Sequence, residues 1–176
     1  ANFKLKGDGQ LKPTVRQKIW AEVDGYVQHL SDNAVHDKPV AKGDILVEQL
    51  SLDLNKEIAA LTGELGKNIE DRRATEDELI DSEELTELDR NQKESHIAQL
   101  GQTIASQQKQ LAILKEKSEK LKVRSPMDGR VITWNVENRL KNRPVTRGEE
   151  LLEVADLSSP WELEVQMPES RMGHIA

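Results

Sequence analysis

The middle of the chain carries apolar residues at helical spacing. They recur in two series at alternating steps of three and four residues, the pattern of a coiled-coil seam with two apolar positions in seven. The first series is Leu54, Ile58, Leu61 and Leu65, and the second is Ile97, Leu100, Ile104, Gln107, Leu111, Leu114, Ser118 and Leu121. No proline occurs from Ser51 to Lys122, although prolines stand on both sides. The pattern predicts long uninterrupted helices here.

The two flanking regions repeat each other. Residues 24–27 read Asp-Gly-Tyr-Val and residues 128–131 read Asp-Gly-Arg-Val. Residues 39–46 begin Pro-Val-Ala-Lys-Gly-Asp, and residues 144–151 begin Pro-Val-Thr-Arg-Gly-Glu. Each copy predicts a glycine turn, a strand, and a second turn that leads into an apolar strand. A few short strands cannot bury an apolar face alone, so we expect the two copies to close on each other as a pseudo-symmetric sandwich.

This closure requires the middle region to fold back. One unbroken helix would separate its ends by roughly 100 Å at about 1.5 Å per residue. We therefore predict an antiparallel hairpin in which facing residues have numbers that sum to about 172, with Ile58 opposite Leu114 and Asn68 opposite Ile104. Its tip falls at about residues 80–90. There Asp81 begins a capping-box sequence that can start the second helix, and Thr75 begins a competing one.

Composition narrows the function classes. The 176 residues are 32% charged and only 3% aromatic, which favours elongated helices over one large core. The net charge of −7 argues against non-specific nucleic-acid binding. Without cysteine there is neither a disulfide nor thiolate chemistry. No apolar run approaches the roughly 18 residues of a membrane span, and the N-terminus is not typical of a signal peptide.

No group of residues predicts catalysis, a cofactor or a metal site. The four histidines, at positions 29, 36, 96 and 174, have neither ligand spacing nor partners for a catalytic triad. Lys38 follows Asp37 as in a turn that carries lipoate, but it precedes the Gly43 turn, whereas a carrier lysine follows that turn. We expect Lys38 to be an ordinary loop lysine and the protein not to be an enzyme.

The hairpin tip is the candidate site. Glu84, Leu85, Thr86 and Leu88 lie in an acid-rich stretch, and the two leucines have no core beneath them. One interpretation is an acidic surface that docks a partner protein. The other is a set of solvated helix faces, with the leucines packed locally on the turn. Both stay open at this point.

In this order around a hairpin, the turns resemble those of the HlyD-like membrane fusion proteins, also called periplasmic adaptor proteins. The matching segments are 23–27, 40–46, 123–131 and 145–149. In addition, residues 161–169 and 9–13 are similar to the strands that enter and leave the β-barrel of that family. The resemblance implies an α+β fold: a lipoyl/biotinyl-like β-sandwich split by a long antiparallel α-helical coiled-coil hairpin, with partial β-barrel strands at the termini.

The implied organisation has five parts. They are a partial β-barrel strand (1–13), the first half of the lipoyl-like domain (14–50), the hairpin (51–122), the second half of the lipoyl-like domain (123–157) and the start of the β-barrel domain (158–176). The chain shows no anchor helix, so we expect it to be a fragment of a longer protein.

The implied function is that of an adaptor subunit in a bacterial efflux or secretion system. Such a protein bridges an inner-membrane transporter to an outer component, works in the periplasm as a homo-oligomer, and meets the membrane only through a segment absent here. One departure concerns the tip: four residues after Arg72, Arg73 and Arg90, where the tunnel-docking motif has leucine, stand two glutamates and an aspartate. Whether an outer-membrane tunnel protein is a partner therefore stays open at this point. The alternative function is a structural coiled-coil spacer without a transport role.

Overall fold

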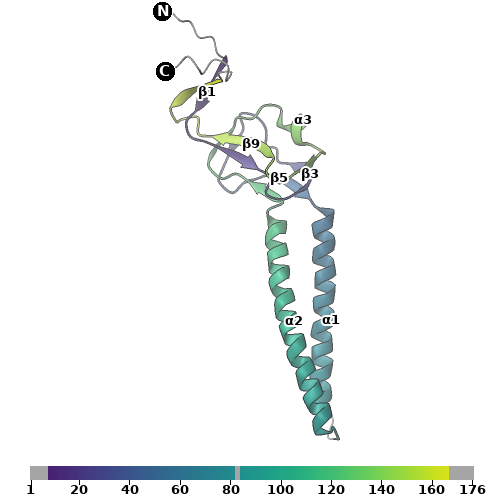
Figure 1. Cartoon of the computed structure of the whole chain (residues 1–176). Helices are drawn as coiled ribbons and strands as arrows, with labels where there is room; N and C mark the ends of the chain where they lie inside the picture. The colour runs from purple at the N-terminus through teal and green to yellow at the C-terminus, as the bar shows by residue number, and fades with distance from the viewer. Residues whose placement is uncertain (1–7, 82–83, 167–176) are drawn as a thin grey trace, which may run out of the picture.

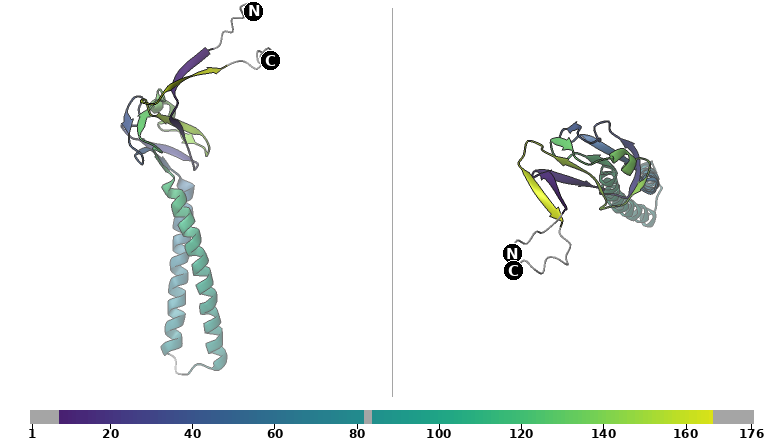
Figure 2. Two further views of the ribbon diagram at one scale, coloured as in Figure 1. Left: turned by 90° about the vertical axis from the view of Figure 1, so that its left-hand side faces the viewer. Right: turned by 90° about the horizontal axis from the view of Figure 1, so that it is seen from above.

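The computed structural model describes residues 8–81 and 84–166, and the chain is a mixed helix-and-sheet protein, as the sequence predicts. Two long helices extend side by side from a small β-rich body, and a two-stranded ribbon leaves the body on the opposite side (Figures 1 and 2). The helices are α1 (Leu52–Asp81), α2 (Glu87–Glu119) and the short α3 (Val136–Leu140). The strands are β1 (Asp8–Pro13), β2 (Arg16–Trp20), β3 (Gly25–Leu30), β4 (Pro39–Val40), β5 (Ile45–Leu50), β6 (Lys122–Arg124), β7 (Gly129–Val131), β8 (Pro144–Val145), β9 (Glu150–Ala155) and β10 (Trp161–Gln166).

The β body consists of two four-stranded antiparallel sheets, ordered β2-β9-β7-β4 and β6-β5-β3-β8. Strands on either side of the hairpin contribute two members to each sheet. Exchanging each strand for its counterpart in the sequence repeat (β2 with β6, β9 with β5, β7 with β3, β4 with β8) converts one order into the other. The repeat is therefore a pseudo-twofold relation in the fold, and neither copy forms a complete sheet alone.

Reciprocal hydrogen bonds join the repeated turns. The Asp24 carboxylate accepts a hydrogen bond from the backbone N–H of Arg147 at 2.7 Å, and the Asp128 carboxylate accepts one from the backbone N–H of Lys42 at 2.7 Å. The glycines that follow Arg147 and Lys42 have φ angles of 85° and 92°, in the left-handed region that favours glycine. The Asp-Gly motif of one copy thus holds the basic-Gly-acidic turn of the other, which explains why both motifs occur twice.

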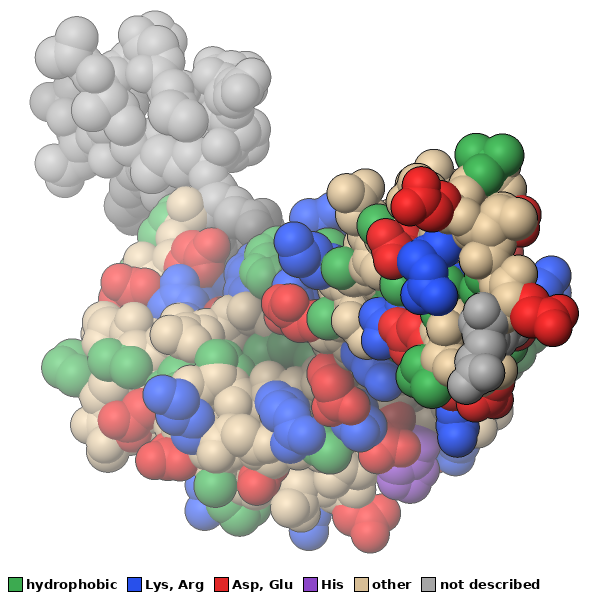
Figure 3. Space-filling model, turned by 90° about the horizontal axis from the view of Figure 1, so that it is seen from below, with side chains coloured by type: hydrophobic (Ala, Val, Ile, Leu, Met, Phe, Trp, Pro, Cys, Tyr) green, Lys and Arg blue, Asp and Glu red, His purple; other side chains and the backbone are tan. Residues whose placement is uncertain are grey.

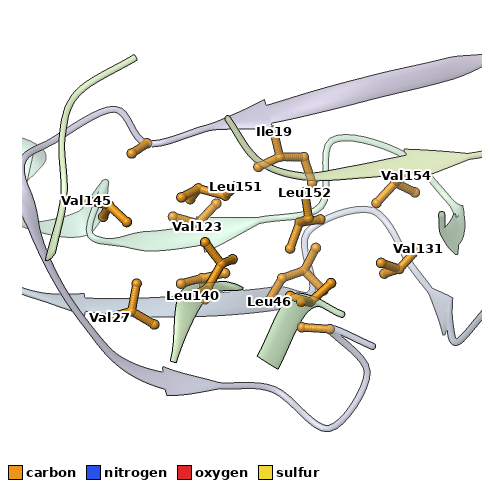
Figure 4. Packing of buried hydrophobic residues seen from close by; sticks show 14 of the residues in the cluster. Ile19, Val27, Leu46, Val123, Val131, Leu140, Val145, Leu151, Leu152 and Val154 are labelled. Carbon is orange, nitrogen blue, oxygen red and sulfur yellow. The ribbon is translucent and has the colours of Figure 1, made fainter. Parts of the chain in front are cut away.

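The main core lies between the two sheets. Apolar side chains from both sheets and from α3 point toward one another and fill the interior (Figure 4). Its largest fully buried side chains are Leu46, Leu140, Leu151, Leu152, Val27, Val47, Val131, Val145 and Val154. The sequence pattern did not indicate α3, which stands between β7 and β8. Its Val136 and Leu140, four residues apart on one helical face, are 2% and 1% exposed and close one side of the core.

The two long helices pack antiparallel. The side chains buried in them are Leu54 and Thr75 of α1 and Leu100, Ile104 and Leu111 of α2. At the base, Ile58 and Leu114, the predicted facing pair, pack on a small cluster that joins hairpin and body. Farther out, the Asn68 amide donates to Gln107 Oε1 at 2.9 Å, one helical turn nearer the base than its predicted partner. The distal half of the hairpin therefore combines this polar pair with the buried apolar side chains of Leu100 and Ile104.

The second helix begins later than the sequence indicated. The N-cap of α2 is Thr86, whose hydroxyl oxygen accepts a hydrogen bond from the backbone N–H of Asp89 at 3.1 Å. The prediction that Asp81 starts this helix is wrong, because Asp81 is the last residue of α1 and Thr86 supplies the cap. Residues 82–83 of the predicted capping sequence lie outside the described residues. The competing start, Thr75, is buried within α1.

The ribbon consists of β1 and β10, which pair antiparallel with Leu11 opposite Leu163 and Pro13 opposite Trp161. One of its faces is apolar: Leu11, Leu163 and Trp161 are 66%, 62% and 54% exposed. Ion pairs cover the other face, where Lys12 bonds Glu164 at 2.7 Å and Arg16 reaches Glu162 at 2.6 Å. The terminal residues 1–7 and 167–176, which the sequence assigned to barrel strands, lie outside the described residues.

Candidate functional site

The four predicted tip residues lie together where α1 passes into α2. Glu84, Thr86 and Leu88 are exposed and Leu85 is half-buried. The Thr86 hydroxyl is occupied within the chain, because it accepts from the Asp89 N–H and donates to the Asp89 carboxylate at 2.6 Å. Thr86 therefore fixes the start of α2, while Glu84 and Leu88 remain available to a partner. Leu88 is 65% exposed in the first turn of α2.

Sequence reasoning missed Ile80, which is 79% exposed in the last turn of α1. Ile80 and Leu88 give the tip two large apolar side chains, one on each helix, in contact with water. The signal was present in the sequence: Leu79 continues the seam, so its neighbour Ile80 must point about 100° away from it on a helix.

The tip also carries the whole net charge of the chain. Residues 70–94 include eleven acidic and four basic residues, a difference of seven that equals the net charge of −7 for the full sequence. The rest of the chain contains 21 acidic and 21 basic residues, so their charges cancel. Figure 3, which views the molecule from below, shows acidic side chains around the end of the hairpin, with some basic and apolar side chains between them. The distal hairpin is thus a negatively charged surface with isolated apolar contacts.

Three cationic or titratable side chains near the tip are already paired. Lys93 of α2 bonds Glu78 of α1, and Arg72 bonds Glu76 at 3.1 Å within α1. His96 Nε2 lies 3.2 Å from the Asp71 carboxylate across the helix pair. The Lys93–Glu78 and His96–Asp71 contacts join the two helices near the tip, whereas the Arg72–Glu76 ion pair lies within α1.

Elsewhere in the described ranges the structure offers no candidate for catalysis. No group of three or more His, Asp or Glu side chains within residues 8–81 and 84–166 is arranged to hold a metal ion. The His36 ring stacks on the Trp134 ring, with centroids 3.5 Å apart. Lys38 lies in a loop, and its backbone N–H donates a hydrogen bond to the Val35 carbonyl. His174 lies outside the described residues. Within the same ranges, no helix has the length and apolar character needed to cross a bilayer.

Several side chains of the ribbon region have shifted pKa values. The hydrogen bond from Lys12 lowers the pKa of Glu164, and the hydrogen bond to Glu162 raises the pKa of Arg16. In α3, Lys141 lowers the pKa of Glu137 in the same way. These groups form ion pairs at the surface, in which Lys12 and Arg16 are half-buried. They indicate structural ion pairs and not a site built for proton transfer.

Comparison with known proteins identifies the fold. No protein-family model and no curated protein sequence matches the chain. Among solved structures, it is similar to ZneB from Cupriavidus metallidurans (TM-score 0.64, 23% identity, 96% of this chain and 72% of that one). It is also similar to MacA from Actinobacillus actinomycetemcomitans (0.65, 17%, 94% and 58%) and to the membrane fusion protein Spr0693 from Streptococcus pneumoniae R6 (0.65, 12%, 89% and 66%). The chain thus spans between about three fifths and three quarters of these proteins.

Proposed function

We propose that this chain, which has the fold of the membrane fusion proteins as the sequence resemblance predicted, is the hairpin-bearing part of a periplasmic adaptor. The adaptor would belong to a bacterial efflux or secretion system and bridge an inner-membrane transporter to an outer component. The observation that carries the proposal is the interleaved β body from which a long helical hairpin projects. In this function the chain is not an enzyme and needs no cofactor.

The proposed domain organisation follows the five parts named from the sequence. Residues 14–50 and 123–157 would form a split lipoyl-like domain, and residues 51–122 a coiled-coil hairpin. The exchange of strands between the two sheets supports the first assignment. The apolar face of the ribbon supports a β-barrel that continues from residues 1–13 and 158–176, because further strands would cover its exposed leucines. Such a full-length protein would be a homo-oligomer anchored in the inner membrane.

The mechanism we propose is mechanical. The β body provides a fixed base, and a 30-residue α1 gives the hairpin a reach of about 45 Å at about 1.5 Å per residue. The hairpin is attached by the cluster of Val23, Leu54 and Leu121, so it leaves the body at a defined angle. The Ser51 hydroxyl supports this exit by accepting a hydrogen bond from the Leu54 N–H at 3.3 Å.

We propose that the tip docks a protein with a basic surface and small apolar recesses. The net charge of −7 over residues 70–94 supports a basic partner, and exposed Ile80 and Leu88 support apolar contacts. Glu84 and Leu85 would lie at the centre of this contact. Thr86 would act through the helix start that it caps. The alternative of a coiled-coil spacer that pairs between chains is less well supported, because the seam is already filled by α1 against α2.

Charge reversal at the tip tests this function. In a bacterial strain that lacks its own copy of the gene, we expect Glu84→Lys and Leu88→Asp each to reduce export of the system's substrate at least tenfold at unchanged protein level. Asp32→Lys, an exposed loop position of the β body, is the matched control and should export normally. Normal export by both tip variants would refute tip docking. If deleting the whole gene leaves every export activity intact, the adaptor function itself is wrong.

A further inference from the structure

A groove runs along one side of the hairpin, between α1 and α2 near the base. The residues that directly precede the seam positions form one stripe on each helix, and the two stripes lie on the same side of the pair. They line two adjoining hollows of about 690 and 470 Å³, which share Glu57 and Ile113. We call this combined hollow the base groove. Its walls are Asp53, Glu57, Ala60 and Glu64 of α1 and Gln110, Ile113 and Lys117 of α2.

The middle of the base groove is apolar. Ile113 is 64% exposed there, and the half-buried side chains of Leu61 and Leu114 lie beside it. Ala60 lies on the opposite wall, where its small side chain leaves space next to Ile113. A single exposed isoleucine on a convex surface would be ordinary, but this one stands in a concave site with further apolar side chains. The groove therefore has room for an apolar side chain of another molecule.

The α1 wall of the base groove is acidic. Asp53, Glu57 and Glu64 are exposed, and no basic residue of α1 lines the groove. Within the described residues, none of these three carboxylates forms an ion pair. Glu57 and Glu64 stand three residues before and four residues after Ala60, about one helical turn on each side of the apolar space. The electrostatic complement of this wall is a row of cations that flanks an apolar side chain.

The shape of the base groove suits a helix. From Asp53 to Glu64 the α1 wall measures about 17 Å at about 1.5 Å per residue, which equals three turns of a partner helix. Its two walls are themselves helices, so a third helix can lay its side chains between them as in a helical bundle. Recognition of an amphipathic helix in such a groove uses apolar anchors at intervals of three and four residues.

A second copy of this chain does not supply such a helix from its hairpin. The basic stretch of the hairpin is Lys109–Lys122, which contains five lysines and two glutamates. Its Leu111 is buried against α1, and its Leu114 packs on the cluster at the hairpin base. The apolar side of this stretch is therefore already occupied within its own chain. The helix that fits the base groove must bring both its cations and a free apolar side from a different protein.

We infer that the base groove binds a basic amphipathic helix of another protein. An apolar side chain of that helix enters the space between Ala60 and Ile113, and its Lys or Arg side chains lie over Glu57 and Glu64. The inference goes beyond the proposed function, because the base groove lies at the opposite end of the hairpin from the docking tip. Its first test measures binding and not export, so it can fail or succeed independently of the adaptor function.

Probe peptides test the groove on the full chain. Two fluorescent peptides of about 18 residues, long enough to form helix in water, carry the same leucines at every third or fourth position. One has lysines beside the leucines and the other has glutamates. We expect the lysine peptide to bind at least tenfold more tightly by fluorescence anisotropy. Equal affinities for the two peptides would overturn the inference.

Variants of the chain show whether the lysine peptide occupies the base groove. Ile113→Gln should weaken its binding at least fivefold, whereas Ala112→Gln, at an exposed position about 100° around α2, should not. Glu57→Gln combined with Glu64→Gln should weaken binding at least tenfold. Glu70→Gln combined with Glu94→Gln changes the net charge equally at exposed positions outside the groove and should have little effect. Equal losses for the two double variants, or full binding by Ile113→Gln, would mean non-specific attraction to an acidic hairpin and would overturn the inference.

Photo-crosslinking in the cell identifies the natural occupant. A benzophenone amino acid in place of Ile113 should crosslink another protein, and mass spectrometry of the crosslinked peptide should find Lys or Arg beside an apolar helical face. The same group in place of Ala112 should give at least fivefold less product. A crosslink to a second copy of this chain, a crosslink to a segment without basic residues, or a yield no higher than that from position 112 would each overturn the inference.

Discussion

Gly129 occupies a position in β7 where no other residue fits, and Gly129→Ala tests the interleaved β body directly. A Cβ atom at this position would lie 2.4 Å from the Ala155 carbonyl oxygen and 2.9 Å from its carbonyl carbon. Both atoms belong to the backbone of β9, the neighbouring strand, so a side-chain rotation cannot relieve the overlap. Ala155 is fully buried, which also prevents the strand from moving outward without opening the core.

We expect Gly129→Ala to lower the free energy of unfolding of the β body by about 3 kcal/mol or more, the upper part of the range for overpacked sites. Gly148→Ala is the matched control: a Cβ there meets nothing within 4 Å, and only the φ of 85° opposes it. That substitution should cost about 1–2 kcal/mol, the energy of a left-handed conformation for a residue with a side chain.

Urea unfolding followed by tryptophan fluorescence measures both variants, because Trp20, Trp134 and Trp161 all lie in the β body or its ribbon. Circular dichroism at the helix band follows the hairpin separately. The reasoning would be refuted if Gly129→Ala cost no more than Gly148→Ala. That result would mean that β7 does not pass against β9 at the close distance on which the pairing of the two copies depends.

Three further predictions concern the turns, the hairpin and the ribbon. Asp128→Ala should lower the free energy of unfolding by about 1–2 kcal/mol in urea, because the backbone N–H of Lys42 loses the carboxylate that accepts its hydrogen bond at 2.7 Å. An unchanged midpoint would contradict the interlocking of the turns. Asn68→Leu combined with Gln107→Leu should raise the melting temperature of the hairpin, since an apolar pair replaces one polar contact of the seam, and Asn68→Leu alone should not. Glu164 has a lowered pKa in the folded protein, so the stability that it contributes is present above the unfolded value of about 4.3 and is lost as the pH falls through the folded value. Acid titration by NMR should therefore detach β1 from β10 at a higher pH when Lys12→Met removes its partner, and an unchanged transition would show that the pair does not stabilise the ribbon.

Periodicity and repetition were sufficient to predict the main architecture. The seam positions predicted two helices, and the repeated turns required the ends of the helical region to meet, so a hairpin followed without any tertiary information. The residues that pack at the base of the hairpin, Ile58 and Leu114, could be predicted because apolar side chains there specify the register of the two helices. Distal register was less well specified: Asn68 and Gln107 bond each other, and polar residues tolerate such a shift.

The candidate site was predicted only in part. The acid-rich tip and Leu88 could be found in the sequence, whereas the role of Thr86 depended on which of several capping sequences the chain uses. Three residues, Thr75, Asp81 and Thr86, each have an acidic residue three positions later. The local sequence does not indicate which of them caps the second helix. The choice follows from where α1 loses contact with α2, which is a property of the packed pair.

The sequence alone determined the order of the parts: strands and turns, a helix that returns, and a second copy of the same turns. This order could be predicted because the periodicity of apolar residues, the positions of prolines and the glycine turns are local signals that act over a few residues. Tertiary structure alone decided how the two copies interlock through Asp24 and Asp128, and why α3 closes one side of the core. These features join residues about 100 positions apart, and only the packed chain brings such residues together, since their separation is set by core volume and strand pairing and not by local preference.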